Sequence, residues 1–338
     1  MAATASSTTS PSWRPRLSGW LRRLASSDLL ILWLSVAYAL VLGPFVPGFA
    51  SPANLTNVLI AVLPLFILAL GQTFVLITGG IDLSITSIVA LASVLGALAM
   101  NDNAGWLAGS PVAAPAAVLL MLATGTVVGV ANGIAVARLR MPAFIVTLTG
   151  MMFFSGLAVW ITKSKNIGGL PAAFNVIGAN PWSAFAAATL AGGFSHLLLT
   201  RSLFGRWLFA VGQNHRVAHI SGVPVTSVTI AAYAACGACA GLASVLYTGQ
   251  AETGSPILGQ RLLLDVIGAT ILGGTSLFGG KGSVLWTLCG VLFLKLVDNS
   301  LNLLSLSVFT ITMLKGSVIL FAALLDAARV RLKTAGRI

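Results

Sequence analysis

Long apolar runs separated by short polar segments are the dominant pattern along this chain. A helix needs about 20 consecutive apolar residues to cross the hydrocarbon core of a bilayer, and windows of that length predict about ten spans. The predicted spans are residues 29–47, 55–78, 83–100, 111–137, 142–162, 182–200, 227–248, 262–279, 283–304 and 308–326. The pattern therefore predicts an all-α fold, a polytopic transmembrane helical bundle.

Polar residues mark both ends of the chain. Residues 1–27 form a basic tail rich in Ser, Thr and Ala, and residues 329–338 form a short basic tail. Residues 28–328 make up the predicted transmembrane domain. Because no small-residue cleavage site follows the first apolar run, we interpret this run as a retained span rather than a signal peptide.

Composition and charge support a membrane protein and set its expected orientation. The chain is 57% hydrophobic and only 8% charged, whereas soluble domains carry about 25% charged residues. The net charge of +12 comes from basic residues between the apolar runs, a distribution that excludes a nucleic-acid-binding face. Fourteen of them fall in segments predicted inside and three outside, Lys163, Lys165 and Arg261. This asymmetry predicts that both termini are cytosolic.

The longest polar interruption in the second half of the chain covers residues 201–226. It mixes cations with apolar residues in the order Arg206, Leu208, Val211, His215, Arg216, Val217, His219 and Ile220. We interpret the segment as a short helix on the membrane surface, with flanking glycines that let the chain turn. An apolar face kept in such a segment favours a docking surface for a soluble partner, and an ordinary connecting loop is the alternative.

A second interruption, residues 78–84, lies inside the apolar stretch. Gly79 and Gly80 break the helix there, and Asp82 and Ser84 stand where the next helix begins. Asp82 is predicted either to cap free backbone N–H groups or to face a transport pathway. A different pattern, Gly125, Gly129 and Gly133, places a glycine stripe on one helix face and predicts a close helical neighbour.

Residues 272–283 look like a phosphate-binding loop but fail its pattern. Thr275 stands where that pattern requires glycine, and Gly282 rather than Ser or Thr follows Lys281. We therefore expect no nucleotide cofactor in this chain. No catalytic or metal-binding spacing occurs, so the chain is predicted not to be an enzyme and to hold no metal. Lys295 and Asp298 are three residues apart on one helix and are predicted to pair.

Four motifs occur in an order that resembles the permease subunit of ribose-type sugar importers of the ATP-binding cassette class. They are residues 78–84, then Phe204-Gly205-Arg206 with Gly212, Asn214 and residues 221–223, then residues 271–282, and finally residues 299–304. The resemblance covers roughly residues 50–326. This family transports ribose, xylose, arabinose or galactose. The chain departs from the family pattern at residues 215–217, which read His-Arg-Val, and at Thr86 and Leu263.

The resemblance implies a permease that moves a sugar or sugar-like polyol across the inner membrane as a multi-pass protein in the lipid bilayer. It implies cytosolic ATPase subunits that bind ATP and magnesium, a periplasmic substrate-binding protein, and a second permease copy or paralogue. The implied coupling-loop residues are Gly205, Arg206, Gly212, Asn214, Arg216, Ala218, Ser221 and Gly222. The implied pathway or helix-break residues are Gly79, Gly80, Asp82, Ser84, Asp265, Gly273, Gly274, Asn299 and Asn302.

Two other functions are compatible with the sequence. An ion-coupled secondary transporter would use Asp82 or Asp265 as a proton or ion site inside the membrane. Alternatively, an ATP-driven permease of the same build would carry a branched-chain amino acid, a nucleoside or an autoinducer instead of a sugar.

Overall fold

The computed structural model describes residues 30–335, in which helices are joined by turns and loops and the one β feature is an isolated bridge, Ile167 to Gly254. Within this range it has 13 helices. The first seven are α2 (Leu30–Leu42), α3 (Pro52–Ile77), α4 (Ile85–Met100), α5 (Ala113–Ala137), α6 (Ala143–Thr162), α7 (Ala172–Ala179) and α8 (Pro181–Arg201). The remaining six are α9 (Leu203–Gln213), α10 (His215–Ile220), α11 (Val225–Ala251), α12 (Leu263–Leu272), α13 (Val284–Leu303) and α14 (Val308–Ala335). The predicted all-α class is confirmed.

Six of these helices are long and apolar enough to cross a membrane, namely α3, α5, α6, α8, α11 and α13. Four shorter apolar helices or helix segments correspond to the other predicted spans: Ile31–Leu42, Ile85–Met100, Leu263–Leu272 and Val308–Phe321. The predicted span 262–279 is too long, because α12 ends at Leu272 before a glycine pair whose second member has a φ of +78°. The structure also contains α7, which no apolar window predicted.

The structure describes part of the predicted C-terminal tail and none of the predicted N-terminal tail. Residues 1–27 lie outside the described range. Residues 329–335 continue α14, which runs to Ala335, so the helix extends beyond the predicted span 308–326.

Two of the spanning helices begin with the same local chemistry, a capping side chain followed by proline. Before α3, the Ser51 hydroxyl accepts a hydrogen bond from the Asn54 N–H (3.3 Å), and Pro52 opens the helix. Before α8, the Asn180 side chain accepts from the Trp182 N–H (2.9 Å), and Pro181 follows it. Proline at the first helical position lacks only an N–H that the helix could not have used.

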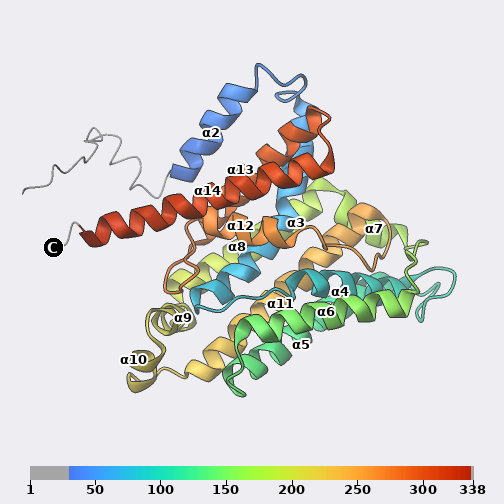
Figure 1. Cartoon of the computed structure of the whole chain (residues 1–338). Coiled ribbons are helices and arrows are strands. Elements are labelled where there is room, and N and C mark those ends of the chain that lie inside the picture. Colours follow the sequence, from blue (N-terminus) through green and yellow to red (C-terminus); the bar gives the residue numbers. More distant parts are fainter. Residues whose placement is uncertain (1–29, 336–338) are drawn as a thin grey trace, which may run out of the picture.

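Helix α3 lies at the centre of the bundle and contacts α8, α11, α12 and α13 (Figure 1). In its most apolar window 89% of the residues are buried, compared with 17% in α6. Burial on all sides by other helices explains why α3 is apolar around its whole circumference.

The glycine stripe predicted on α5 packs against α11, and the two helices run side by side (Figure 1). A Cβ on Gly125 would overlap the Gly237 carbonyl oxygen, and one on Gly129 would overlap the Tyr233 carbonyl oxygen. A Cβ on Gly133 would lie 2.8 Å from the Ile230 Cα. The two backbones therefore approach to a distance that side chains would prevent, which confirms the predicted close neighbour and identifies it.

Candidate functional site

The segment 201–226 folds as two short helices rather than the single one predicted. The Ser202 hydroxyl accepts from the Gly205 N–H (3.0 Å) at the start of α9. The chain then becomes extended at Asn214 (φ −163°), whose side chain accepts from the N–H groups of Arg216 and Val217 (both 3.0 Å) and so starts α10. Asparagine at this position ends one helix and begins the next, because its side chain replaces the missing helical hydrogen bonds.

The apolar face predicted on this segment is divided between two roles. Leu208 and Val211 on α9 are fully buried in the core of the bundle. Val217 and Ile220 on α10 are 58% and 77% exposed. The prediction that all four form one docking face is therefore wrong, because α9 uses its apolar residues to attach to its own bundle.

The implied coupling-loop residues divide in the same way. Gly205 and Ala218 are buried, and a Cβ on Gly205 would overlap the Leu199 carbonyl oxygen of α8. The exposed members are Arg206, Asn214, Arg216, Ser221 and Gly222. Gly222 follows α10 with a φ of +80°, the left-handed backbone that favours glycine at a helix end.

The end of α9 meets two other glycine-containing segments, and together they form what we call the glycine junction: Gly212, Gly79 and Gly280 with their immediate neighbours. A Cβ on Gly212 would overlap both the Ile77 carbonyl oxygen and the Gly280 N–H. These last two groups are hydrogen-bonded to each other (2.8 Å). The structure thus brings together three segments that the sequence analysis had treated separately.

One side chain adds a polar link at the glycine junction. The His215 Nε2 atom lies 3.2 Å from the Thr78 carbonyl oxygen, directly before the helix break. His215 begins α10, so this contact joins α10 to the end of α3, as Gly212 joins α9 to it. The sequence identified His215 as a cation of this segment and as a departure from the family pattern, but it did not predict this contact.

The helix break itself is held by hydrogen bonds to Asp82. Its Oδ1 atom accepts from both the N–H (2.9 Å) and the hydroxyl (2.6 Å) of Ser84, directly before α4. Asn132 of α5 donates to the same hydroxyl (2.8 Å). Asp82 therefore closes a turn on Ser84, the residue before α4, and no side chain of a described residue caps the N–H groups of α4 itself. The Asp82 Oδ2 atom is buried and has no hydrogen-bond partner among residues 30–335.

Neighbouring helices satisfy the backbone of the break. In the amide orientation that satisfies both groups, Gln72 donates to the Asp82 carbonyl (3.0 Å) and accepts from its N–H (3.3 Å). The hydroxyls of Thr147 and Tyr233 both donate to the Ile81 carbonyl (3.3 Å each). Non-helical backbone at membrane depth is stable only when such partners are present. Sequence analysis missed these residues, because each is an ordinary polar residue within an apolar run.

The remaining candidates lie on α12 and α13. Asp265 on α12 forms an ion pair with Lys315 of α14 (2.9 Å). Gly273 packs so closely on α13 that a Cβ there would overlap the Trp286 carbonyl oxygen, and Gly274 has positive φ. Asn302 donates to the Asp298 carbonyl (2.7 Å), and the Asn299 amide nitrogen is buried. No hydrogen bond or ion pair between described residues joins this group to Asp82.

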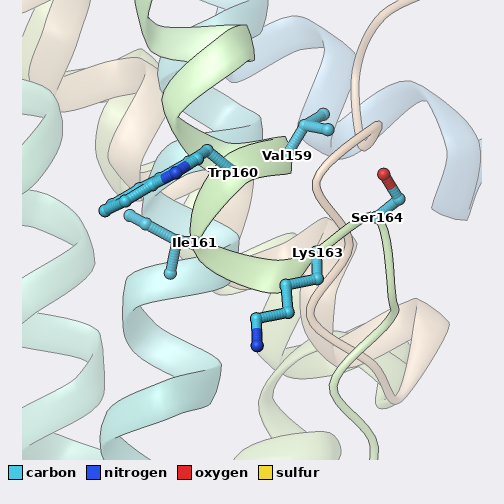
Figure 2. Close-up of a pocket in the computed structure, with 5 residues that line it drawn as sticks. All are labelled: Val159, Trp160, Ile161, Lys163 and Ser164. Carbon is cyan, nitrogen blue, oxygen red and sulfur yellow. The ribbon is translucent and has the colours of Figure 1, made fainter.

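One surface pocket lies apart from all of these residues. It is lined by Val159, Trp160, Ile161, Lys163 and Ser164, which come from the last turn of α6 and the residues after it (Figure 2). Figure 2 shows these side chains fanning away from the helix end rather than converging on one point. The pocket therefore belongs to a helix terminus and not to the candidate site.

The chain was compared with known families and proteins. The family described as "Branched-chain amino acid transport system / permease component" matches residues 54–324. The ribose import permease protein RbsC of Bacillus subtilis is 38% identical over 83% of this chain and 86% of its own length. Its Escherichia coli counterpart is 33% identical over 91% and 94%, and the Escherichia coli L-arabinose permease protein AraH is 31% identical over 86% and 87%.

No solved structure matches the chain. The match to the permease family spans most of the sequence and includes the glycine junction, the helix break and the ion pair of α12 with α14. The chain therefore belongs to this family of permease components, the non-catalytic membrane subunits of ATP-binding cassette importers.

Proposed function

We propose that this chain forms the transmembrane pathway of an importer that carries ribose, arabinose or a related polyol, driven by separate ATPase subunits. The observation that carries the proposal is the glycine junction. It connects an exposed surface helix, α10, with a helix break inside the bundle through Gly212 and His215. Such a connection is what a subunit without its own nucleotide site needs in order to respond to an external ATPase. The likeness to ribose and arabinose permeases supports the choice of cargo.

The proposed topology has about ten spans, with both termini and α9–α10 in the cytosol. The six long and four shorter apolar helices support the number of spans, and the excess of basic residues in the segments predicted inside supports the orientation. In this topology α10 presents its exposed residues to a cytosolic ATPase, which holds ATP and magnesium. A periplasmic binding protein delivers the solute on the other side, and a second permease completes the pathway.

Arg216, Val217 and Ile220 are the proposed ATPase contacts on α10, whereas Gly205, Leu208 and Val211 hold α9 in place. Gly79, Gly80, Asp82 and Ser84 form the proposed hinge, because the backbone leaves the helical conformation there. Asp265, Gly273, Gly274, Asn299 and Asn302 are the proposed pathway residues on α12 and α13. Phe278, 93% exposed and next to the glycine junction, is a further proposed contact that sequence analysis did not select.

Uptake in proteoliposomes tests the function directly. The chain is reconstituted with its ATPase and its binding protein, and radiolabelled D-ribose and L-arabinose are supplied outside. We expect accumulation that requires ATP on the ATPase side and that leucine or a nucleoside does not compete away. Accumulation driven by a proton or sodium gradient without ATP would instead support an ion-coupled transporter, and uptake of leucine alone would contradict the sugar cargo.

Polar substitution on α10 should weaken ATPase binding more than loss of charge. Burying one aliphatic side chain contributes about 1.5–3 kcal/mol, whereas an exposed ion pair contributes about 0–1 kcal/mol. We therefore expect Ile220→Ser and Val217→Ser to reduce co-purification of the ATPase severalfold, and Arg216→Ala to reduce it less. Leu203→Ser, at a residue of α9 that is 49% exposed, is the matched control. A larger loss with Arg216→Ala would indicate that charge dominates the contact.

A further inference from the structure

Three helices in the C-terminal part of the chain are joined by a charged cluster, Asp265, Lys295, Asp298 and Lys315. The Lys315 ammonium on α14 lies 2.9 Å from Asp265 on α12 and 3.2 Å from Asp298 on α13. Lys295 lies 3.7 Å from Asp298 on the same helix, as the sequence predicted. The sequence did not predict Lys315, which makes the two connections between helices.

The cluster lies on the inward face of α14. At about 100° per residue, Met313 and Leu320 lie roughly opposite Lys315 on the helix. They are 73% and 62% exposed, as expected for a face turned to lipid. Ile311, which lies on the same side as Lys315, is only 6% exposed. The helix thus separates a lipid-facing apolar side from a polar side that points between α12 and α13.

The polar side of α14 is partly exposed. The side chains of Asp298, Lys315 and Lys295 retain 25%, 15% and 12% exposure. Charged groups inside a span do not face lipid, because transfer of a charge into hydrocarbon is strongly unfavourable. The opening next to the cluster must therefore face water or another protein subunit.

The chemistry of the cluster fits a neutral solute with many hydroxyl groups. Two carboxylates are balanced by two ammonium groups, so neither Asp265 nor Asp298 offers an unpaired charge to an ion. Carboxylate oxygens accept hydrogen bonds and ammonium groups donate them, and each hydroxyl of a polyol can do both. The Asn299 amide nitrogen, on the residue next to Asp298, is buried without a hydrogen-bond partner among the described residues.

Helix α11 contributes one further group. The Tyr247 hydroxyl is buried, lies within electrostatic range of both carboxylates, and has no hydrogen-bond partner in residues 30–335. A hydroxyl left unpaired in this position lowers stability unless something binds to it during the working cycle.

We propose that Asp265, Asp298 and Lys315, with Tyr247 and Asn299, form a polar selectivity site on the transport pathway that hydrogen-bonds the hydroxyl groups of the passing solute. The proposal rests on the proposed function and identifies where in the chain the cargo is contacted. It assigns Lys315 and Tyr247 a specificity role and gives Asp265 a paired state instead of the free acid that an ion-coupled transporter requires.

Thiol labelling tests the proposal. Asn299→Cys is introduced after replacement of Cys236, Cys239 and Cys289, and the importer is assembled with its partners in lipid nanodiscs. A small charged methanethiosulfonate reagent reacts only with thiols that meet water. We expect it to modify position 299 and ribose-loaded binding protein with ATP to slow that reaction severalfold. Met313→Cys, on the opposite face of α14, is the matched control and should not react.

Removal of one hydroxyl separates solute contact from a purely structural role. Tyr247→Phe removes the unpaired hydroxyl and leaves the ion pairs of Lys315 with Asp265 and Asp298 in place. We expect the variant to insert into the membrane and to show a raised KM for ribose, whereas a purely structural role would leave KM unchanged. Wild-type KM in that variant, or unchanged labelling of position 299 when ribose is supplied, would overturn the proposal. Failure of the unmodified importer to take up any sugar would instead contradict the proposed function.

Discussion

Gly212→Ala should uncouple ATP hydrolysis from solute uptake. The added Cβ would occupy the space of the Ile77 carbonyl oxygen and the Gly280 N–H, and would separate the hydrogen bond between them. Overpacking of this kind costs about 1–3 kcal/mol, which changes an equilibrium about fivefold to more than a hundredfold. We therefore expect ATPase activity to persist while ATP-driven uptake falls at least about fivefold.

Measurement of both activities in one proteoliposome preparation tests this expectation. Gly193→Ala is the matched control, because a Cβ there meets no atom within 4 Å and the residue lies in the spanning helix α8. Gly222→Ala is a second comparison, since only its positive φ and not any neighbour opposes a side chain. Uptake by Gly212→Ala equal to that of Gly193→Ala would show that the close approach of α9 to α3 is not required for coupling.

Gly125→Ala should prevent stable assembly of the bundle. The Cβ would overlap the Gly237 carbonyl oxygen and lie 2.9 Å from the Gly241 N–H. Neither backbone can withdraw locally, because Gly129 and Gly133 hold the same two helices at the same distance one and two turns further along. Helix association in lipid depends on such close packing, because the hydrophobic effect does not drive apolar helices together when lipid already surrounds them. We expect a large loss of thermal stability in detergent and little protein in the membrane.

Thermal unfolding monitored by size-exclusion chromatography provides the measurement. Gly156→Ala, in the spanning helix α6 and with no atom within 4 Å of an added Cβ, should leave the unfolding midpoint unchanged. Gly237→Ala should reproduce the defect from the other helix, because its Cβ would overlap the Gly125 carbonyl oxygen. A stable Gly125→Ala protein would contradict the packing of α5 on α11.

Several features of the fold follow from local sequence, because local physics decides them. The length of the apolar runs alone predicts α3, α5, α6, α8, α11 and α13. A helix is expected there because a membrane-spanning segment must pair its backbone N–H and C=O groups with one another. The glycine stripe on α5 indicates that a partner helix approaches closely, and Gly79 and Gly80 indicate the helix break after α3. The glycine after α10 indicates a left-handed backbone, and Gly222 has it.

The partners in these contacts depend on tertiary structure. Nothing in the sequence indicates that Gly125 meets Gly237, that Gly212 meets Ile77 and Gly280, or that Lys315 joins Asp265 to Asp298. The apolar pattern also does not show whether an apolar side chain packs into the bundle or stays exposed. It could not separate Leu208 and Val211, which attach α9 to its own bundle, from Val217 and Ile220, which stay exposed. A single sequence records which residues can pack closely or carry charge, whereas the choice of neighbour depends on how the helices are arranged in three dimensions.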